Sequence, residues 1–171
     1  MLYGIAFGSN LGNRFENLRL GARALLEQSH SRLVSASNVY ETEPVDCPEG
    51  SSLYLNAVIT LDAIQTPHEL HRIMQSVEAQ FGRPSVRALN APRELDLDIL
   101  FADGLTMKDE QLTIPHPRLH LRRFVLQPLA DICPEMVLPG QRQSVTSLLA
   151  RLEDDLQKVT VISDHHWATS D

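Results

Sequence analysis

The sequence predicts a mixed α/β (α+β) fold, and three observations support that prediction. Apolar residues recur at three- and four-residue intervals in two segments, 14–28 and 67–81, which is the period of one helix face. Runs rich in β-branched and aromatic residues flank both segments. Stretches containing glycine, proline or asparagine separate the elements at 10–13, 41–53 and 82–92. The order β, α, β, β, α, β is that of a ferredoxin-like core, with a mostly antiparallel sheet and helices on one face.

Local signals predict each element of the first half of this core. Residues 2–9 form an apolar, glycine-punctuated strand, and Asn13 is placed to cap the helix at 14–28. Two β-rich runs, Val34–Tyr40 and Tyr54–Leu61, predict strands on either side of a long irregular loop.

The second half begins with Pro67, a residue suited to the first turn of a helix, and Leu70, Ile73 and Met74 belong to the buried stripe of that helix. The irregular segment 82–92 leads into a predicted strand at Leu95–Phe101.

Additional elements follow the core. They are a small hairpin at 105–112, a short helix at 124–132, a further helical segment at 145–155 and a closing strand at 159–162. The last residues, 163–171, are polar and terminal, so we expect a frayed tail.

Composition indicates one compact domain, assigned to residues 1–162, with 163–171 as the polar tail. The chain has 171 residues, of which 43% are hydrophobic and 22% charged, as in ordinary globular proteins. There is no basic leader followed by an apolar stretch, and no apolar run approaches the roughly 20 residues that span a bilayer. The two cysteines, Cys47 and Cys133, have no metal-ligand spacing. We therefore expect a cytoplasmic monomer with no membrane association.

The charge is unevenly distributed. The net charge of −7 argues against a nucleic-acid partner, because binding to a phosphate backbone requires many basic side chains. Residues 72–123, however, hold eight basic and seven acidic residues, and Arg83, Arg87 and Arg93 fall within eleven residues that contain no acid. One interpretation of this basic segment is that it binds a small, compact polyanion. The other is that it is a solvated surface loop with no ligand.

Asp96 and Asp98 lie within a predicted strand, where alternate side chains share a face. The two carboxylates are then roughly 6 to 7 Å apart, twice the rise per residue of a strand. Mg²⁺ relieves such repulsion, since it typically takes one or two protein carboxylates and completes its shell with water and phosphate oxygens. The alternative is an exposed edge strand whose acids face solvent.

Cations that can pair with phosphate surround this strand. They are Arg83, Arg87 and Arg93 before it, and His116 and Arg122 after it. Metal ligands and arginines together describe a nucleoside triphosphate site. The sequence has no P-loop, the glycine-rich turn that binds phosphates in many nucleotide enzymes. The turn at residues 8–14 contains glycines but lacks the lysine of that motif.

A second cluster suits a flat ligand. Tyr54 and Asn56 lie two apart on a predicted strand and share a face, which offers an aromatic surface beside an amide that can donate and accept. Phe124 could supply an opposing ring. A heteroaromatic bicycle would use these groups well, and ordinary core packing of the two aromatic residues is the alternative.

In order and spacing, the strings FGSNLGNR, YETEPV, YLNAV, FGRPSVR, APRELDLDILF and IPHPRLHLRRFVLQPLADICPE closely resemble the hydroxymethyldihydropterin pyrophosphokinases. The resemblance runs from about Tyr3 to about Pro139. It implies a ferredoxin-like fold, two Mg²⁺ ions, and transfer of the β,γ-diphosphate of ATP to the hydroxymethyl group of a dihydropterin, with release of AMP.

The resemblance also implies roles for individual residues. The metal ligands are Asp96 and Asp98, and the catalytic residues are these two with Arg83 and Arg93. The ATP contacts are Gln75, Arg87, Arg93, Thr113, His116 and Arg122. The pterin contacts are Thr42, Pro44, Val45, Tyr54, Asn56 and Phe124. Glu78 falls where the family often has a carboxylate near the sites, and a surface helix acid is the alternative.

Three positions depart from the family pattern. Asn90 stands where many members have a tryptophan that closes over the pterin, Ser85 aligns with a second loop arginine unless Arg87 substitutes for it, and Pro117 follows the histidine. Two other functions stay open, a different Mg²⁺-dependent nucleotide enzyme and a non-catalytic ferredoxin-like binding module.

Overall fold

A computed structural model describes residues 1–44, 52–82, 92–152 and 158–169 of the chain. Val45, Arg83 and Arg87, which the sequence assigned to the site, lie outside the described residues, as do Ser85 and Asn90. Within the described part no helix is both long and apolar enough to cross a membrane.

The core has the predicted ferredoxin-like arrangement. Its elements are β1 (Leu2–Ser9), α1 (Arg14–Ser29), β2 (Arg32–Ala36), β3 (Val39–Thr42), β4 (Tyr54–Asp62), α2 (Pro67–Gln80) and β5 (Asp96–Ala102). With β8 (Val159–Ser163), the sheet runs β5-β1-β4-β3-β8, β2 also pairs with β4, and all these pairings are antiparallel. The two central strands, β1 and β4, thus lie side by side, as expected when each helix crosses over one intervening strand.

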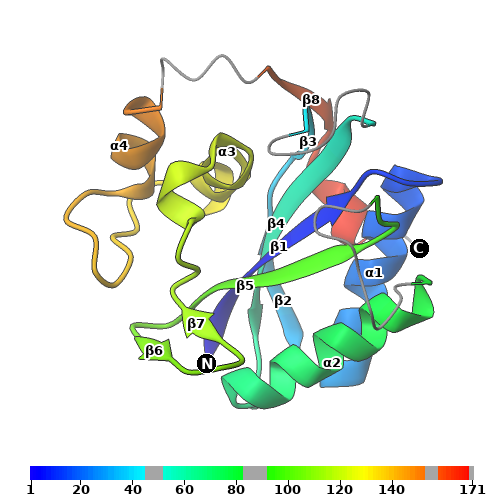
Figure 1. The fold of residues 1–171 in the computed structure, drawn as a ribbon, viewed down its shortest axis with the longest axis horizontal. Coiled ribbons are helices and arrows are strands. Elements are labelled where there is room, and N and C mark those ends of the chain that lie inside the picture. The colour runs from blue at the N-terminus through cyan, green and yellow to red at the C-terminus, as the bar shows by residue number, and fades with distance from the viewer. Residues whose placement is uncertain (45–51, 83–91, 153–157, 170–171) are drawn as a thin grey trace.

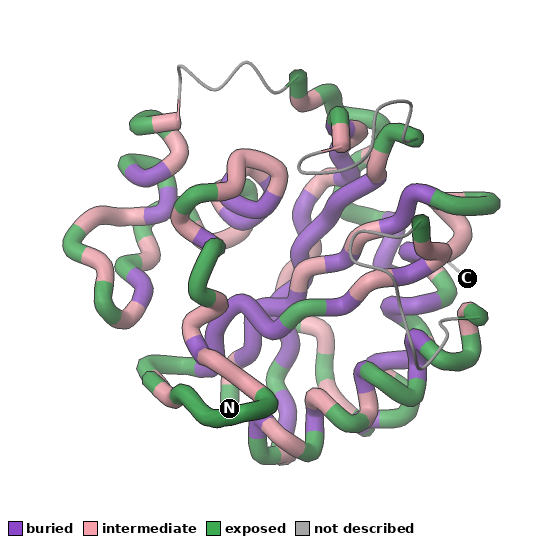
Figure 2. Tube along the Cα trace, in the orientation of Figure 1, coloured by how far each residue is buried: buried purple, intermediate pink, exposed green. Residues whose placement is uncertain are grey.

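Helices cover both faces of the sheet (Figure 1). On one face α1 and α2 enclose a core that includes Phe7, Leu18 and Leu70. On the other face α3 (Arg123–Ile132) and α4 (Val145–Ala150) pack on a second cluster that includes Val58 and Leu126. Alternation along the strands produces both cores, and Figure 2 shows buried residues concentrated along the strands. The sequence predicted helices on one face only, because the ferredoxin-like pattern covers only α1 and α2. The pattern does not say where the later helices α3 and α4 pack.

The predicted helix starts are confirmed. The Asn13 side chain accepts a hydrogen bond from the Glu16 backbone N–H. At α2, Thr66 and Glu69 form a reciprocal capping box and Pro67 occupies the first turn.

The predicted single strand Val34–Tyr40 is wrong, because the chain breaks at Ser37 and forms β2 and β3 instead. The Ser37 hydroxyl accepts the Val58 N–H at 2.9 Å and donates to the Asn38 carbonyl at 2.7 Å. A side-chain oxygen thus replaces a backbone acceptor in the ladder. Serine can interrupt a strand in this way because its hydroxyl competes with backbone groups for hydrogen bonds.

The hairpin is displaced toward the C-terminus relative to the prediction, with strands β6 (Met107–Lys108) and β7 (Thr113–Ile114). Asp109 turns the chain, because its carboxylate accepts the N–H groups of Gln111 and Leu112, each at 2.9 Å.

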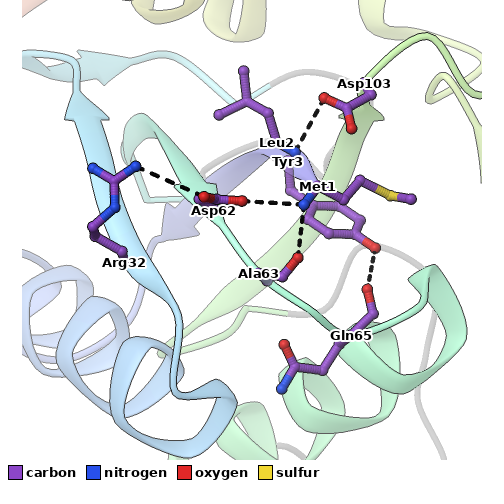
Figure 3. Close-up of polar contacts among 8 residues, drawn as sticks. All are labelled: Met1, Leu2, Tyr3, Arg32, Asp62, Ala63, Gln65 and Asp103. Atoms are coloured by element: carbon purple, nitrogen blue, oxygen red, sulfur yellow. Dashed lines mark hydrogen bonds and ion pairs between the residues drawn. The ribbon is translucent and has the colours of Figure 1, made fainter.

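The start of β1 is fixed by polar contacts to the far end of β4 and beyond (Figure 3). The Met1 ammonium donates to Asp62 at 3.1 Å, and the Leu2 N–H donates to Asp103 at 3.1 Å. The Tyr3 hydroxyl donates to the Gln65 carbonyl at 2.6 Å. Burial, with the charge of Asp103 adding, raises the pKa of Tyr3 to about 12, so the phenol stays neutral.

The expectation of a frayed tail is wrong for the described residues 163–169. After β8 (Val159–Ser163) the chain forms a 3₁₀ turn, η2 (His165–Ala168), that buries Trp167. A lone tryptophan in a polar segment shows no periodicity, so the sequence pattern could not predict its burial.

Candidate active site

The strand register brings the two predicted ligand clusters to one face of the sheet. Gly8 of β1 lies opposite Asp96 of β5 on one side and opposite Asn56 of β4 on the other. Directly opposed residues in antiparallel strands project to the same face. The spacing of neighbouring strands, about 4.8 Å, therefore places Asp96 and Asn56 about 10 Å apart.

Because Gly8 has no side chain, the surface of the sheet between Asp96 and Asn56 is left open. A Cβ added at this position would lie 3.7 Å from Asn56 Oδ1 and 3.7 Å from Asp96 Cβ, which is ordinary van der Waals distance. A larger side chain would instead fill the space between the amide and the carboxylate. The glycine thus permits a ligand to approach the backbone closely.

Asp96 forms an ion pair with the arginine that leads into its strand. Arg93 Nη1 lies 2.8 Å from Asp96 Oδ1, and both side chains are mostly buried. Burial disfavours the charged guanidinium, but the nearby carboxylates of Asp96 and Asp98 outweigh this effect and raise the pKa of Arg93. The site therefore contains a charged guanidinium and a charged carboxylate that are both partly shielded from solvent.

The backbone of Arg93 is fixed separately by Asn10. Asn10 Oδ1 accepts the Arg93 N–H at 2.8 Å, and the Asn10 N–H donates to the Arg93 carbonyl at 3.1 Å. Asn10 is buried. Its two hydrogen bonds therefore satisfy the backbone N–H and the carbonyl of Arg93 in place of water. From the sequence alone, Asn10 was predicted only to form part of a turn.

A cavity of about 230 Å³ lies along β5, the edge strand of the sheet. Its lining comes from α2, β5, the β6–β7 hairpin and the segment after it. The residues are His71, Leu97, Asp98, Ile99, Gln111, Leu112, Thr113, His116 and Pro117. Three predicted site residues, Asp98, Thr113 and His116, thus share one cavity.

His116 is held as a neutral imidazole. Its backbone N–H donates to the Leu100 carbonyl at 2.9 Å, and its Nδ1 accepts the Arg118 N–H at 3.3 Å. Burial, together with the positive charges of Arg122 and Arg118, lowers the pKa of His116 to about 4, although the charge of Asp96 opposes the shift. With Nδ1 accepting, Nε2 carries the proton and can donate to an anion.

On the opposite side of Gly8, two buried polar residues fix each other. Asn56 Nδ2 donates to Thr42 Oγ1 at 2.7 Å, and the two residues are 7% and 2% exposed. This bond sets the orientation of the amide and leaves Oδ1 on the side of Gly8. Tyr54 lies opposite Thr42 in the ladder, on the same face.

Sequence comparison identifies the protein's relatives. Residues 4–134 match the family 7,8-dihydro-6-hydroxymethylpterin-pyrophosphokinase (HPPK). The chain belongs to the HPPK family. It is 36% identical over 150 residues to the 2-amino-4-hydroxy-6-hydroxymethyldihydropteridine pyrophosphokinase of Haemophilus influenzae, covering 88% of this chain and 92% of that protein. It is 38% identical over 133 residues to the enzyme of the same name from Bacillus subtilis, covering 77% and 78%.

Other relatives are much longer. The chain is 36% identical over 148 residues to the folic acid synthesis protein fol1 of Schizosaccharomyces pombe, covering 86% of this chain and 20% of fol1. Among solved structures, wild-type HPPK-DHPS of Plasmodium falciparum with STZ-DHP superimposes with a TM-score of 0.69 at 15% identity, covering 91% of this chain and 44% of that one. At this low identity, the likeness shows only that the two chains share a fold.

Three other residues expected from the HPPK resemblance, Phe124, Pro44 and Gln75, lie within the described part of the chain. Phe124 is the second residue of α3, and the Arg122 guanidinium lies 5.4 Å from its ring centroid, a cation–π contact. Pro44 lies two residues beyond β3, which carries Thr42, and ends the described segment 1–44. Gln75 is exposed on α2, on the helix face of His71.

His71 itself was missed, although a signal was present. It precedes Gln75 by four residues, the spacing of neighbours on one helix face. The cavity-lining Gln111 and Leu112 had no such signal, because they lie on a hairpin turn.

Glu78 is buried, at 4% exposure, so the surface-acid alternative is wrong. Its Oε1 accepts the Leu97 N–H at 2.8 Å. Leu97 lies between Asp96 and Asp98 on an edge strand, where outward-facing N–H groups have no strand partner. Glu78 therefore fixes the backbone that carries both aspartates.

We predict that replacing Glu78 loosens this strand. Glu78→Leu would leave the buried Leu97 N–H without its acceptor, at about 1–3 kcal/mol, and Glu78→Gln would keep an oxygen there. Amide hydrogen exchange at Leu97 should accelerate strongly in the leucine variant and little in the glutamine variant. Glu69→Ala is the matched control, because it removes a cap of the same helix. Equal exchange in the leucine variant and the wild type would contradict this role.

The pKa of His116 gives a pH prediction for the ligand-free protein. As pH falls below about 6.5, unfolded chains take up a proton on this imidazole, but the folded protein resists until about pH 4. The free energy of unfolding should therefore decrease from pH 6.5 to 4, and the contribution is fully present above pH 6.5. Denaturant titrations across this range should show a flatter pH dependence for His116→Asn. A midpoint near 6.5 for His116 in an NMR titration would contradict the prediction.

Proposed function

We propose that the chain transfers the diphosphate of ATP to the hydroxymethyl group of 6-hydroxymethyl-7,8-dihydropterin and releases AMP, in folate synthesis. Membership of the HPPK family supports the reaction. The observation that carries the proposal to this chain is the alignment of Asp96, Gly8 and Asn56 across three strands. This alignment supports the proposal because a carboxylate and an amide share one face.

The nucleotide would occupy the cavity beside β5, with its phosphates toward Asp98 and Asp96. Apolar Leu97, Ile99 and Leu112 line this cavity together with polar groups, as a nucleoside requires. Arg93 has five N–H donors, so it can bind a phosphate oxygen while it pairs with Asp96. The neutral His116 can donate from Nε2, and Arg122 supplies positive charge at the start of α3.

Asp96 and Asp98 would hold Mg²⁺, with two ions expected from the family resemblance. Within the described residues no group of three or more His, Cys, Asp or Glu could hold a metal ion. Two carboxylates nevertheless suit Mg²⁺, which commonly takes one or two of them and obtains its other ligands from phosphate and water. When bound, the ions would neutralise charge on the phosphates and align them.

The pterin would lie on the other side of Gly8. Its 2-amino-4-oxo pyrimidine edge both donates and accepts, and the Asn56 amide, oriented by Thr42, matches that pattern. Tyr54, Phe124 and Pro44 would border the ring, and Val45 is assigned to the same pocket by resemblance. The hydroxymethyl group would then point across Gly8 toward the phosphates.

Catalysis would depend mainly on positioning and electrostatics. Holding the hydroxyl in line with the β-phosphorus removes much of the entropic barrier. Arg83 and Arg93 would stabilise charge that develops on the transferred group, and Gln75, Thr113 and Arg87 would complete the ATP contacts. We further propose a cytoplasmic monomer that takes only small-molecule substrates, and the net charge of −7 supports the absence of a nucleic-acid partner.

We predict that ATP, Mg²⁺ and the dihydropterin yield AMP and a pterin diphosphate. Asp96→Asn or Asp98→Asn should each lower turnover by about 10²- to 10³-fold, the range found when one charge-stabilising group is removed. Asp103→Asn is the matched control, since it changes a carboxylate just beyond the same strand and keeps an oxygen for Leu2.

Each alternative function predicts a different result, either in this assay or in a binding measurement. Release of ADP or free phosphate, with the pterin unchanged, would favour another nucleotide enzyme. Absence of both ATP and pterin binding by calorimetry would favour a non-catalytic module. Near-native turnover in both aspartate variants would reject the metal assignment.

A further inference from the structure

The C-terminal segment 159–169 lies beyond the family match, which ends at residue 134, yet it is part of the sheet. Its strand β8 pairs with β3 in antiparallel register and forms the edge opposite to β5 (Figure 1). We call β8 and η2 together the C-terminal brace. Without it, the four-residue β3 would itself be an edge strand, held on one side only by β4.

Trp167 anchors the brace in the core. It is 1% exposed, and its ring meets Phe7 edge-on with centroids 5.5 Å apart. Its indole N–H donates to the Ser37 carbonyl at 2.9 Å. Ser37 sits at the break between β2 and β3, where its hydroxyl has replaced a backbone acceptor. The tryptophan thus supplies the donor for a buried carbonyl at the point where β3 begins.

The other end of β3 reaches the pterin side of the site. In the ladder Thr42 lies opposite Val159 of β8 on one side and opposite Tyr54 of β4 on the other. The Thr42 hydroxyl is the group that accepts from Asn56 Nδ2. One continuous path therefore leads from Trp167 through Ser37 and β3 to the amide that faces Gly8.

The nucleotide side does not share this path. The cavity residues belong to α2, β5, the hairpin and the segment after it, at the opposite edge of the sheet. A loosened β3 should therefore disturb the pterin contacts before the nucleotide contacts.

We propose that the C-terminal brace positions Thr42, and through it Asn56, for the pterin, with Trp167 as the residue that fastens it. The inference rests on the proposed function, because it assigns Asn56 to the pterin. Trp167 is a positioning residue in this account and touches neither substrate.

The test compares steady-state constants of full-length variants. Trp167→Ala should raise the KM for the dihydropterin about fivefold or more, the lower range of measured coupling energies, and leave the KM for ATP within about twofold. Trp167→Phe keeps an aromatic ring against Phe7 and should recover part of the pterin affinity. Leu25→Ala is the matched control, because it removes a fully buried side chain of the same core from α1.

A second measurement separates coupling from general loss of stability. Coupling is reciprocal, so a bound pterin should slow amide exchange in 159–163 of the wild type, while ATP alone should not. Helix α4 is the internal control, since global stabilisation would slow exchange there as well.

The proposal is overturned if pterin and ATP constants rise together in Trp167→Ala, if Leu25→Ala raises the pterin KM equally, or if the pterin protects 159–163 and α4 alike. Circular dichroism and the fluorescence of Trp167, the chain's only tryptophan, establish that each variant is folded and whether the brace is docked in those that retain it. If wild-type protein made no AMP from these substrates, the proposed function would fail instead, so the two failures are distinguishable.

Discussion

The candidate site depends on the antiparallel register of β5, β1, β4 and β3. This register is fixed by hydrogen bonds along β1, which pairs with β4 from Leu2 to Ser9 and with β5 from Tyr3 to Gly8. A slip of one residue in any pairing would turn Asp96 or Asn56 to the face covered by α1 and α2. Both cores oppose such a slip, since every strand residue would change sides.

Buried residues around the candidate site hold its backbone or its side chains in place. Asn10 holds Arg93, Glu78 holds Leu97, and Thr42 holds Asn56. Each holding residue is buried and hydrogen-bonded, so removing it would leave a polar group without a partner inside the protein. Positioning residues of this kind are what phosphoryl-group transfer requires, because most of its catalysis comes from alignment and electrostatics.

Sequence patterns predicted the core elements well because helix and strand periodicity reflect burial on one face. Alternation also placed Asp96 and Asp98 together, and it put Tyr54 beside Asn56. Three features carry no periodic signal: the side-chain hydrogen bonds of Ser37 that break a strand, the burial of Trp167 in a polar tail, and the inward orientation of Glu78. Each depends on a partner distant in sequence, which only the folded chain brings near.

We propose that a metal-bound nucleotide and a pterin lie side by side across Gly8. The most direct measurement uses Mn²⁺ in place of Mg²⁺ with a non-hydrolysable ATP analogue, and follows the relaxation of the protons of a bound pterin by NMR. We expect strong paramagnetic relaxation of the hydroxymethyl protons at a distance of two strand spacings, about 10 Å, and loss of the effect in Asp96→Asn. Pterin protons that relax no faster with Mn²⁺ than with Mg²⁺, while both ligands are bound, would contradict it.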